Sequence, residues 1–151
     1  MLTPGEHSGT FGRISSKANA MRLVLISLIL LLAQAAHGQE ILAQEHWPDG
    51  TLKATRYSEG VRVHFITYHE NGRVKEMGCF LNGKRDGVWR QYNDTGVLMT
   101  QASFSHGQRQ GVWLFRNHAN MIVGRLSYSD GLIQRGESLD EQGAVVAMRT
   151  Y

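Results

Sequence analysis

The amino-acid sequence predicts an all-β fold built from about five β-hairpin repeats. Three observations carry this prediction. The segment Gly87-Val88-Trp89 recurs 24 residues later as Gly111-Val112-Trp113, and a fixed period in this range is typical of repeat arrays. Glycine is abundant (17 residues) and proline is scarce (2 residues), which suits many tight turns. From Gln39 onward, short runs of strand-forming residues take the place of amphipathic helical patterns.

The aromatic residues follow the same step of 24 residues. Phe104 aligns with an aromatic residue in the unit before it and in the unit after it, and so does Trp89. Aromatic residues that recur once per repeat usually pack neighbouring hairpins together. We therefore expect two ladders of rings, the first formed by Phe80, Phe104 and Tyr128 with Tyr57 and Tyr151 as outer members, and the second by Trp89 and Trp113 with Phe65.

The outer units depart from the pattern. The turn residue and the aromatic residue are eight positions apart in the later units, whereas Gly50 and Tyr57 are seven apart. In the last unit, Gly136 and Leu139 stand where the tryptophan and tyrosine of the third unit would be. Atypical end repeats are expected of an open array, whose terminal units must tolerate an uncovered side.

Two kinds of turn alternate along the chain. The first kind should be a two-residue type I′ turn, because Asn-Gly and Asp-Gly pairs accept the positive φ angles that it needs. The second kind should open a slightly longer link to the next strand. The first kind comprises Asp49-Gly50, Asn71-Gly72, Thr95-Gly96, Ala119-Asn120 and Gln142-Gly143, and the second Glu59-Gly60, Asn82-Gly83, His106-Gly107 and Asp130-Gly131.

In the third unit, we expect one strand over residues 88–93 and a second over residues 97–105. Side chains alternate between the two faces of a strand. Alternation therefore places Leu98, Thr100, Ala102 and Phe104 on one face, and their neighbours on the other.

The charge distribution argues against nucleic-acid binding. The formal net charge is +3. Three of the 16 basic residues and one of the 13 acidic residues precede Gln39, which leaves 13 basic and 12 acidic residues in the rest. A binding surface for phosphates needs a concentrated basic patch, and no such patch is visible in the sequence.

Residues 21–38 are predicted to be a signal peptide. The run from Leu23 to Ala36 is apolar except for Ser27 and Gln34, and it is shorter than the roughly 20 residues of a membrane span. Arg22 precedes the run and small residues follow it, as at signal cleavage sites. A buried core helix and an uncleaved anchor are the alternatives. We expect export to the periplasm or the exterior, and no stable membrane insertion after cleavage.

Met21 and Arg22 alone would supply the short, positively charged segment with which a signal peptide begins. Residues 1–20 are polar and lack periodicity. We therefore predict that they are a non-native or disordered extension, that translation starts at Met21, and that residues 39–151 form the repeat domain.

No catalytic or metal-binding motif is present in the sequence. Sequences such as G-x-S-x-G, H-E-x-x-H and paired cysteines do not occur, and no cofactor is expected. His69 and His118 fall beside turns and are interpreted as solvated residues. Cys79 is the single cysteine, so it is either a small strand residue or the site of an intermolecular bridge.

A candidate interaction surface combines aromatic and basic residues. A single-layer sheet cannot bury both of its faces, so some rings should stay accessible. Lys84, Arg85 and Arg109 are expected in turns of the second kind along one edge, where charge either contacts an acidic partner or only reflects hydration. The aromatic members of the candidate surface are Trp89, Tyr92, Trp113 and Phe115.

These residues resemble the bacterial variant of the MORN-repeat family (membrane occupation and recognition nexus). Its pattern, G-x-W-x-x-Y-x-x-x-G-x-[LV] followed by an aromatic residue and a turn, is carried by Gly87, Trp89, Tyr92, Gly96, Leu98, Phe104 and Gly107, and the resemblance covers roughly residues 46 to 151. The resemblance implies an elongated antiparallel meander of hairpins that forms a curved, single-layer sheet. It also implies non-catalytic roles, as an interaction scaffold or as an antitoxin-like partner of a toxin. Arg116 departs from the pattern, because it stands where the third unit has Tyr92.

The sequence thus predicts an exported, non-enzymatic protein-interaction scaffold with an unidentified protein partner. The alternative is a carbohydrate- or cell-wall-binding module that uses a groove at Trp89 and Trp113. The chain could also associate with a second copy of itself through an end strand, because exposed sheet edges pair readily.

Overall fold

The computed structural model of the protein describes residues 38–151, and Gln39–Tyr151 form one compact unit. The predicted extension (residues 1–20) and the predicted signal peptide, except for its last residue, Gly38, lie outside the described residues. Among residues 38–151, no helix has the length and apolar character that crossing a membrane requires.

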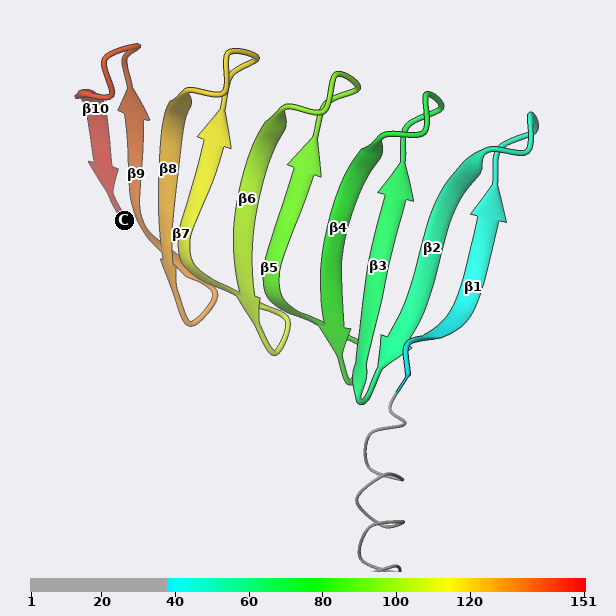
Figure 1. The fold of residues 1–151 in the computed structure, drawn as a ribbon. Helices are drawn as coiled ribbons and strands as arrows, with labels where there is room; N and C mark the ends of the chain where they lie inside the picture. Colours follow the sequence, from blue (N-terminus) through cyan, green and yellow to red (C-terminus); the bar gives the residue numbers. More distant parts are fainter. Residues whose placement is uncertain (1–37) are drawn as a thin grey trace, which may run out of the picture. The chain divides into compact units, whose positions relative to one another are not determined.

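The described chain forms one antiparallel sheet in which every strand pairs with its neighbours in sequence (Figure 1). This meander confirms the predicted all-β fold of hairpin repeats, with two strands in each of five units. The strands are β1 (Glu40–His46), β2 (Leu52–Glu59), β3 (Arg62–Tyr68), β4 (Val74–Leu81), β5 (Lys84–Tyr92), β6 (Leu98–Ser105), β7 (Gln108–Arg116), β8 (Ile122–Ser129), β9 (Leu132–Leu139) and β10 (Val145–Thr150).

The two kinds of turn have the reverse of the predicted geometry. Turns of the second kind are the tight ones: in Asn82-Gly83 both residues have positive φ (51° and 74°), and the flanking Leu81 and Lys84 pair directly. This is the type I′ geometry. His106-Gly107 and Asp130-Gly131 repeat it, whereas the first tight turn uses Gly60-Val61 with only the glycine at positive φ.

Turns of the first kind are three-residue loops, so the prediction of type I′ geometry there was wrong. In the third unit, the Gly96 amide donates to the Asn93 carbonyl at 3.0 Å, and Gly96 alone has positive φ. This is a type I turn followed by a left-handed residue. The Asn93 side chain holds the loop, because its Oδ1 accepts the amides of Thr95 (3.1 Å) and Val97 (2.8 Å).

The tight turns also move the strand starts. The strand predicted over residues 88–93 begins at Lys84, and the one predicted over 97–105 begins at Leu98. Lys84, Arg85 and Arg109 are therefore strand residues and not loop residues, which corrects their predicted placement.

One face of the sheet, here called the aromatic face, carries most of the packing. It presents Phe65 of β3, Phe80 of β4, Trp89 of β5, Phe104 of β6, Trp113 of β7 and Tyr128 of β8, whose rings are in mutual contact. No side chain in the described residues is completely buried, as expected of a sheet with no second layer. Packing across neighbouring strands takes the place of a central core.

Tyr57 lies on the face opposite to the aromatic face, so its predicted place in the ladder was wrong. Its ring stacks on His64 at 4.8 Å, and the register pairs it with His64, next to the pair of Arg56 and Phe65. The odd spacing from Gly50 explains this position. Successive side chains point to opposite faces, so seven residues in place of eight turn the ring over and leave Ser58 in the expected register position.

Candidate interaction surface

The two predicted ladders form one continuous row of rings. Trp89 lies between Phe80 and Phe104, with centroid separations of 5.0 and 6.3 Å. Trp113 in turn lies between Phe104 and Tyr128, at 5.1 and 4.9 Å. These separations lie in the range at which aromatic pairs stabilise each other. The six rings of this row were all predicted to pack in ladders, but their division into two separate ladders was wrong.

Trp89 is an internal part of this row. Only 3% of its surface is exposed, and its indole nitrogen donates to the Cys79 carbonyl at 3.2 Å. The Trp113 indole makes the same bond, at 3.0 Å, to the Ser103 carbonyl one repeat later. Both acceptors lie where the strand register shifts, so each indole satisfies a carbonyl at an interruption of the backbone ladder.

Small residues on the neighbouring strands make room for the two tryptophans. A Cβ atom on Gly78 would lie 2.2 Å from the Trp89 ring, so only glycine fits there. One repeat later, the buried Ala102 stands in the register position of Gly78 and Trp113 in that of Trp89. In the next pair of strands Leu126 faces Gly136, at 3.3 Å from its ideal Cβ. The large and small partners have thus exchanged places toward the C-terminal end.

Arginine side chains cover the aromatic row. The Arg85 guanidinium carbon is 4.3 Å from the Trp89 centroid and 5.3 Å from that of Phe104. Arg109 lies 4.9 Å over Tyr128, Arg56 lies 5.6 Å over Phe65, and Arg149 lies 5.0 Å over Tyr151. At these separations the ring faces attract the cations. We call Arg56, Arg85, Arg109 and Arg149 the arginine row.

A β-bulge at a glycine orients each of the two central arginines, Arg85 and Arg109. In β5, Gly87 has a φ of 71°, and two additional β5 residues lie opposite the step from Met77 to Cys79. Gly111, with a φ of 66°, does the same in β7. Each bulge lies between an arginine and the tryptophan four positions later, and such bulges bend a strand and redirect its side chains.

Carboxylates are few beside the arginine row. Glu76 is 3.8 Å from Arg85 and Glu45 is 4.0 Å from Arg56, which is too long for strong hydrogen bonds. Within residues 38–151, no carboxylate lies within 4.0 Å of Arg109 or Arg149. The row is therefore a positive strip over aromatic rings, in which two arginines have only long carboxylate contacts and two have none among the described residues.

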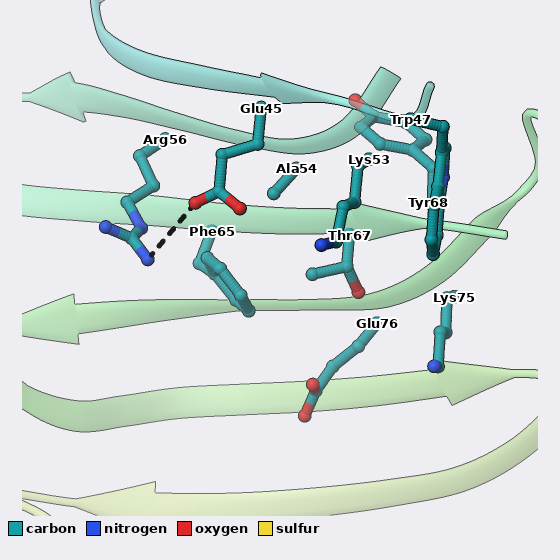
Figure 2. A pocket seen from close by; sticks show the side chains of 10 residues that line it. All are labelled: Glu45, Trp47, Lys53, Ala54, Arg56, Phe65, Thr67, Tyr68, Lys75 and Glu76. Atoms are coloured by element: carbon teal, nitrogen blue, oxygen red, sulfur yellow. Dashed lines mark ion pairs between the residues drawn. The ribbon is translucent and has the colours of Figure 1, made fainter. Parts of the chain in front are cut away.

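Three hollows follow the same face. The first has a volume of about 260 Å³ and is lined by Trp47, Phe65 and the weakly paired Arg56 and Glu45, among others (Figure 2). Figure 2 shows the ammonium groups of Lys53 and Lys75 in the same region. A second hollow of about 80 Å³ is lined by the rings of Trp89, Phe104 and Trp113 together with Arg85 and Glu76. A third hollow of about 290 Å³ lies beside Arg149 and Tyr151.

The residues predicted to form the interaction surface differ in their burial and in the face they occupy. Trp89 is buried, whereas Trp113 and Phe115 are half-buried on the aromatic face. Tyr92 does not belong to this face, because its hydroxyl lies 3.9 Å from the sulfur of Met77, which alternates with Gly78 and points the other way. Lys84 is exposed at the start of β5, against Gly107.

Sequence reasoning missed Arg56 and Arg149 as parts of the surface, and it missed the role of the bulges. A detectable signal was present. Arg85-Asp86-Gly87-Val88-Trp89 and Arg109-Gln110-Gly111-Val112-Trp113 share the pattern R-x-G-V-W, in which the arginine and the tryptophan are joined by a glycine.

The opposite face holds a small polar cluster around Cys79. The Arg62 guanidinium donates to the Cys79 sulfur at 3.7 Å and to the Asp86 carboxylate at 2.9 Å. These two bonds raise the pKa of Arg62 above its ordinary value, the cysteine contact having the larger effect. Cys79 is buried, which favours its reading as a small strand residue. Within the described residues, no three His, Cys, Asp or Glu side chains lie together as metal ligands would.

His69 departs from its interpretation as a solvated turn residue. It is half-buried, and its Nε2 lies 3.0 Å from the Tyr92 carbonyl of the next unit. His118 is exposed, as predicted, and its Nδ1 is 3.2 Å from the Asn93 side chain. Both residues therefore join the loops of adjacent units.

No protein-family model matches this chain, and no curated protein matches it in sequence. Among solved structures, the chain is similar to a mutant of S. aureus TarM in complex with fondaparinux, alpha-GlcNAc-glycerol and UDP. The identity is 9% and the TM-score 0.34, over 74% of this chain and 22% of that chain. The chain thus matches about a fifth of that protein's length, and a likeness this weak carries no functional argument.

Proposed function

We propose that the repeat domain is the non-enzymatic protein-interaction module of an exported protein and that the aromatic face is its recognition surface. The observation that carries the proposal is the arginine row, which is held over aromatic rings: in the part of the chain that the structure describes, two of its four members have no carboxylate within 4.0 Å, and the other two have only long contacts. Arginines and aromatic rings are enriched where proteins recognise each other. The export step rests on the predicted signal peptide, and the resemblance to MORN-type repeats supports a scaffold or antitoxin-like role.

The hollows add to this support. A flat sheet face offers a partner little grip, whereas side chains can insert into the depressions of about 80 to 290 Å³ along the aromatic face. The described sheet has no second layer on this side, so the face is available to a partner.

Site-specific photo-cross-linking tests the proposal. Phe115 and Leu114 are neighbours in β7, both half-buried, and they lie on opposite faces of the sheet. We expect the full chain with a photoreactive phenylalanine at position 115, expressed in its own cells, to form an adduct with a discrete partner protein. The same group at position 114 is the matched control and should not form it. Adducts from neither position, or from position 114 alone, would contradict the proposal.

A carbohydrate-binding role is the alternative, and it is less well supported. A sugar ring needs an open aromatic face on which to stack, and Trp89 is 3% exposed with Arg85 lying over its ring. Titration of the tryptophan fluorescence with oligosaccharides or peptidoglycan fragments distinguishes the two roles. A saturable change that is lost in Trp113→Leu would favour the carbohydrate.

A further inference from the structure

We propose that Arg85 and Arg109 bind an extended acidic segment of the partner protein, one carboxylate to each guanidinium. This inference rests on the proposed function and names the chemistry of the partner. The two residues are equivalent in successive repeats, since each stands two positions before a bulge glycine and four before a tryptophan.

Stacking prepares both guanidinium groups for binding. Arg85 is held by two rings, and Arg109 by Tyr128. A stacked guanidinium keeps its N–H groups in a plane from which it can grip a carboxylate with two bonds. Because the side chain is already ordered by the ring, binding costs less conformational entropy than it would for a free arginine.

Local charge favours an acidic ligand. The Arg85 side chain is 47% exposed, and its nearest carboxylate, Glu76, is 3.8 Å away. Arg109 is exposed and has no carboxylate partner within the described residues. One of these cations has no carboxylate partner in residues 38–151 and the other has only a long contact, so together they favour a ligand that carries two anionic groups.

The strand spacing sets the distance between the two anionic groups. Arg85 lies in β5 and Arg109 in β7, with β6 between them. Neighbouring strands are about 4.8 Å apart, so β5 and β7 are roughly 10 Å apart across the sheet. The register places Arg109 opposite Phe104 and Gly87, two residues along β5 from Arg85, so the backbones of the two arginines are roughly 12 Å apart. A polyproline II segment rises about 3.1 Å per residue with three residues per turn. Acidic residues three positions apart in such a segment point the same way and are about 9 Å apart, and the long arginine side chains can cover the remaining distance.

An apolar contact completes the site. The hollow of about 80 Å³ is lined by Arg85 and by the rings of Trp89, Phe104 and Trp113. Glu76 also lines it, whereas Arg109 does not, and its volume suits a small apolar side chain. The expected ligand is therefore an extended segment with acidic residues at every third position and small apolar residues between them.

Fluorescence anisotropy with the full chain tests this inference. The probe is a fluorescein-labelled peptide of four Asp-Pro-Ala repeats, and the comparison probe has Asn in place of each Asp. We expect saturable binding of the Asp peptide, binding at least about tenfold weaker for the Asn peptide, and loss of affinity as salt rises. Equal binding of the two peptides, or none, would overturn the inference.

Variants locate the site. We expect Arg85→Gln/Arg109→Gln to lower the affinity for the Asp peptide by about tenfold or more, since two charge-assisted contacts are lost. Arg90→Gln removes the same charge from the opposite face of β5 and should change it less than about twofold. Arg109→Lys keeps the charge and the fold but loses the planar grip, so an intermediate loss is expected. A loss in Arg90→Gln equal to that of the double variant would show non-specific attraction and overturn the assignment.

The remaining controls separate this inference from the proposed function. A single-stranded oligothymidylate that binds more tightly than the Asp peptide, through the same arginines, would overturn the assignment to a protein ligand. If the adduct from position 115 persists in the double variant, the aromatic face binds a protein but not through this pair. In that case the inference fails and the proposed function stands.

Discussion

At the scale of single residues, the close approach between Gly78 and Trp89 shows how this chain does without a second layer. The ring occupies the space that any side chain at position 78 would need. It also donates a hydrogen bond to the adjacent carbonyl. The tryptophan that the sequence singled out as a possible contact residue is thus chiefly a structural one, and the arginine above it is the accessible group.

We predict that Gly78→Ala destabilises the protein by about 1–3 kcal/mol, the usual cost of overpacking. Gly124→Ala is the matched control. Gly124 is also a strand glycine without positive φ, but its ideal Cβ has no neighbour closer than 3.5 Å, so little change is expected. Urea unfolding followed by tryptophan fluorescence measures both variants. Equal stability of the two would show that the contact at Gly78 is not limiting.

A second residue-scale prediction concerns pH. The Asp49 carboxylate accepts hydrogen bonds from the Thr51 hydroxyl at 2.7 Å and from the Thr51 amide at 2.9 Å. Both bonds lower the pKa of Asp49 below its ordinary value of 3.8, and the hydroxyl has the larger effect. A lowered folded-state pKa adds stability above the unfolded pKa, and this stability is lost as pH falls through the folded pKa. Thr51→Val should therefore raise the pKa of Asp49 toward 3.8, which NMR titration of the carboxyl carbon measures.

The control for this prediction is in the third unit. Thr95 donates the same kind of bond, at 2.8 Å, to the uncharged Asn93. Thr95→Val should therefore lower the stability by a similar amount at pH 3 and pH 7, whereas the effect of Thr51→Val should shrink toward pH 3. An unchanged pKa of Asp49 in Thr51→Val would refute the assigned cause.

At the scale of the element, the bulge is the feature that joins fold and site. A regular strand would keep Arg85 and Trp89 far apart along its axis, because each residue rises by about 3.3 Å. With Gly87 in the left-handed region, the chain bends and the long arginine side chain folds back over the ring. The arginine row therefore depends on backbone geometry as well as on charge.

We predict that Gly111→Ala destabilises the sheet by roughly 1–2 kcal/mol, because an alanine resists the left-handed conformation. Nothing lies within 4 Å of the ideal Cβ, so the cost is conformational and not steric. Gly111→Asn should cost less, since asparagine tolerates positive φ better. Thermal unfolding by circular dichroism orders the variants, and an alanine variant as stable as the asparagine variant would argue against the bulge.

The strands could be predicted from the sequence because the 24-residue repeat defines them. The turn types could not, because they depend on local backbone geometry. The 24-residue step predicted the number of strands and the residues of the aromatic row. It could not give the turn types, because residues such as Asn and Gly occur in both kinds of turn. The difference comes from a side-chain acceptor such as Asn93, which closes a three-residue loop. Tyr57 shows the same limit, since one missing residue reverses its face.

At the scale of the whole described sheet, stability should be carried by contacts between neighbouring hairpins, because each strand pairs only with the strands next to it. Such arrays tolerate the loss of an entire repeat better than the loss of part of one. The candidate site has the same organisation, since each central repeat supplies one arginine, one bulge and one tryptophan. The arginines and tryptophans of the central repeats could be picked out from the sequence, but only the register shows the bulges and places these parts on one surface.

Deletion of residues 87–110 tests this account most directly. It removes 24 residues and joins Asp86 to Gly111, so that Trp113 takes the place of Trp89 beside Gly78. Deletion of residues 87–109 removes one residue fewer, and it therefore turns the following side chains to the wrong face. Circular dichroism and urea unfolding should show a cooperatively folded sheet for the 24-residue deletion and loss of structure for the 23-residue deletion. If both deletions unfold the protein equally, the chain is not an array of interchangeable repeats.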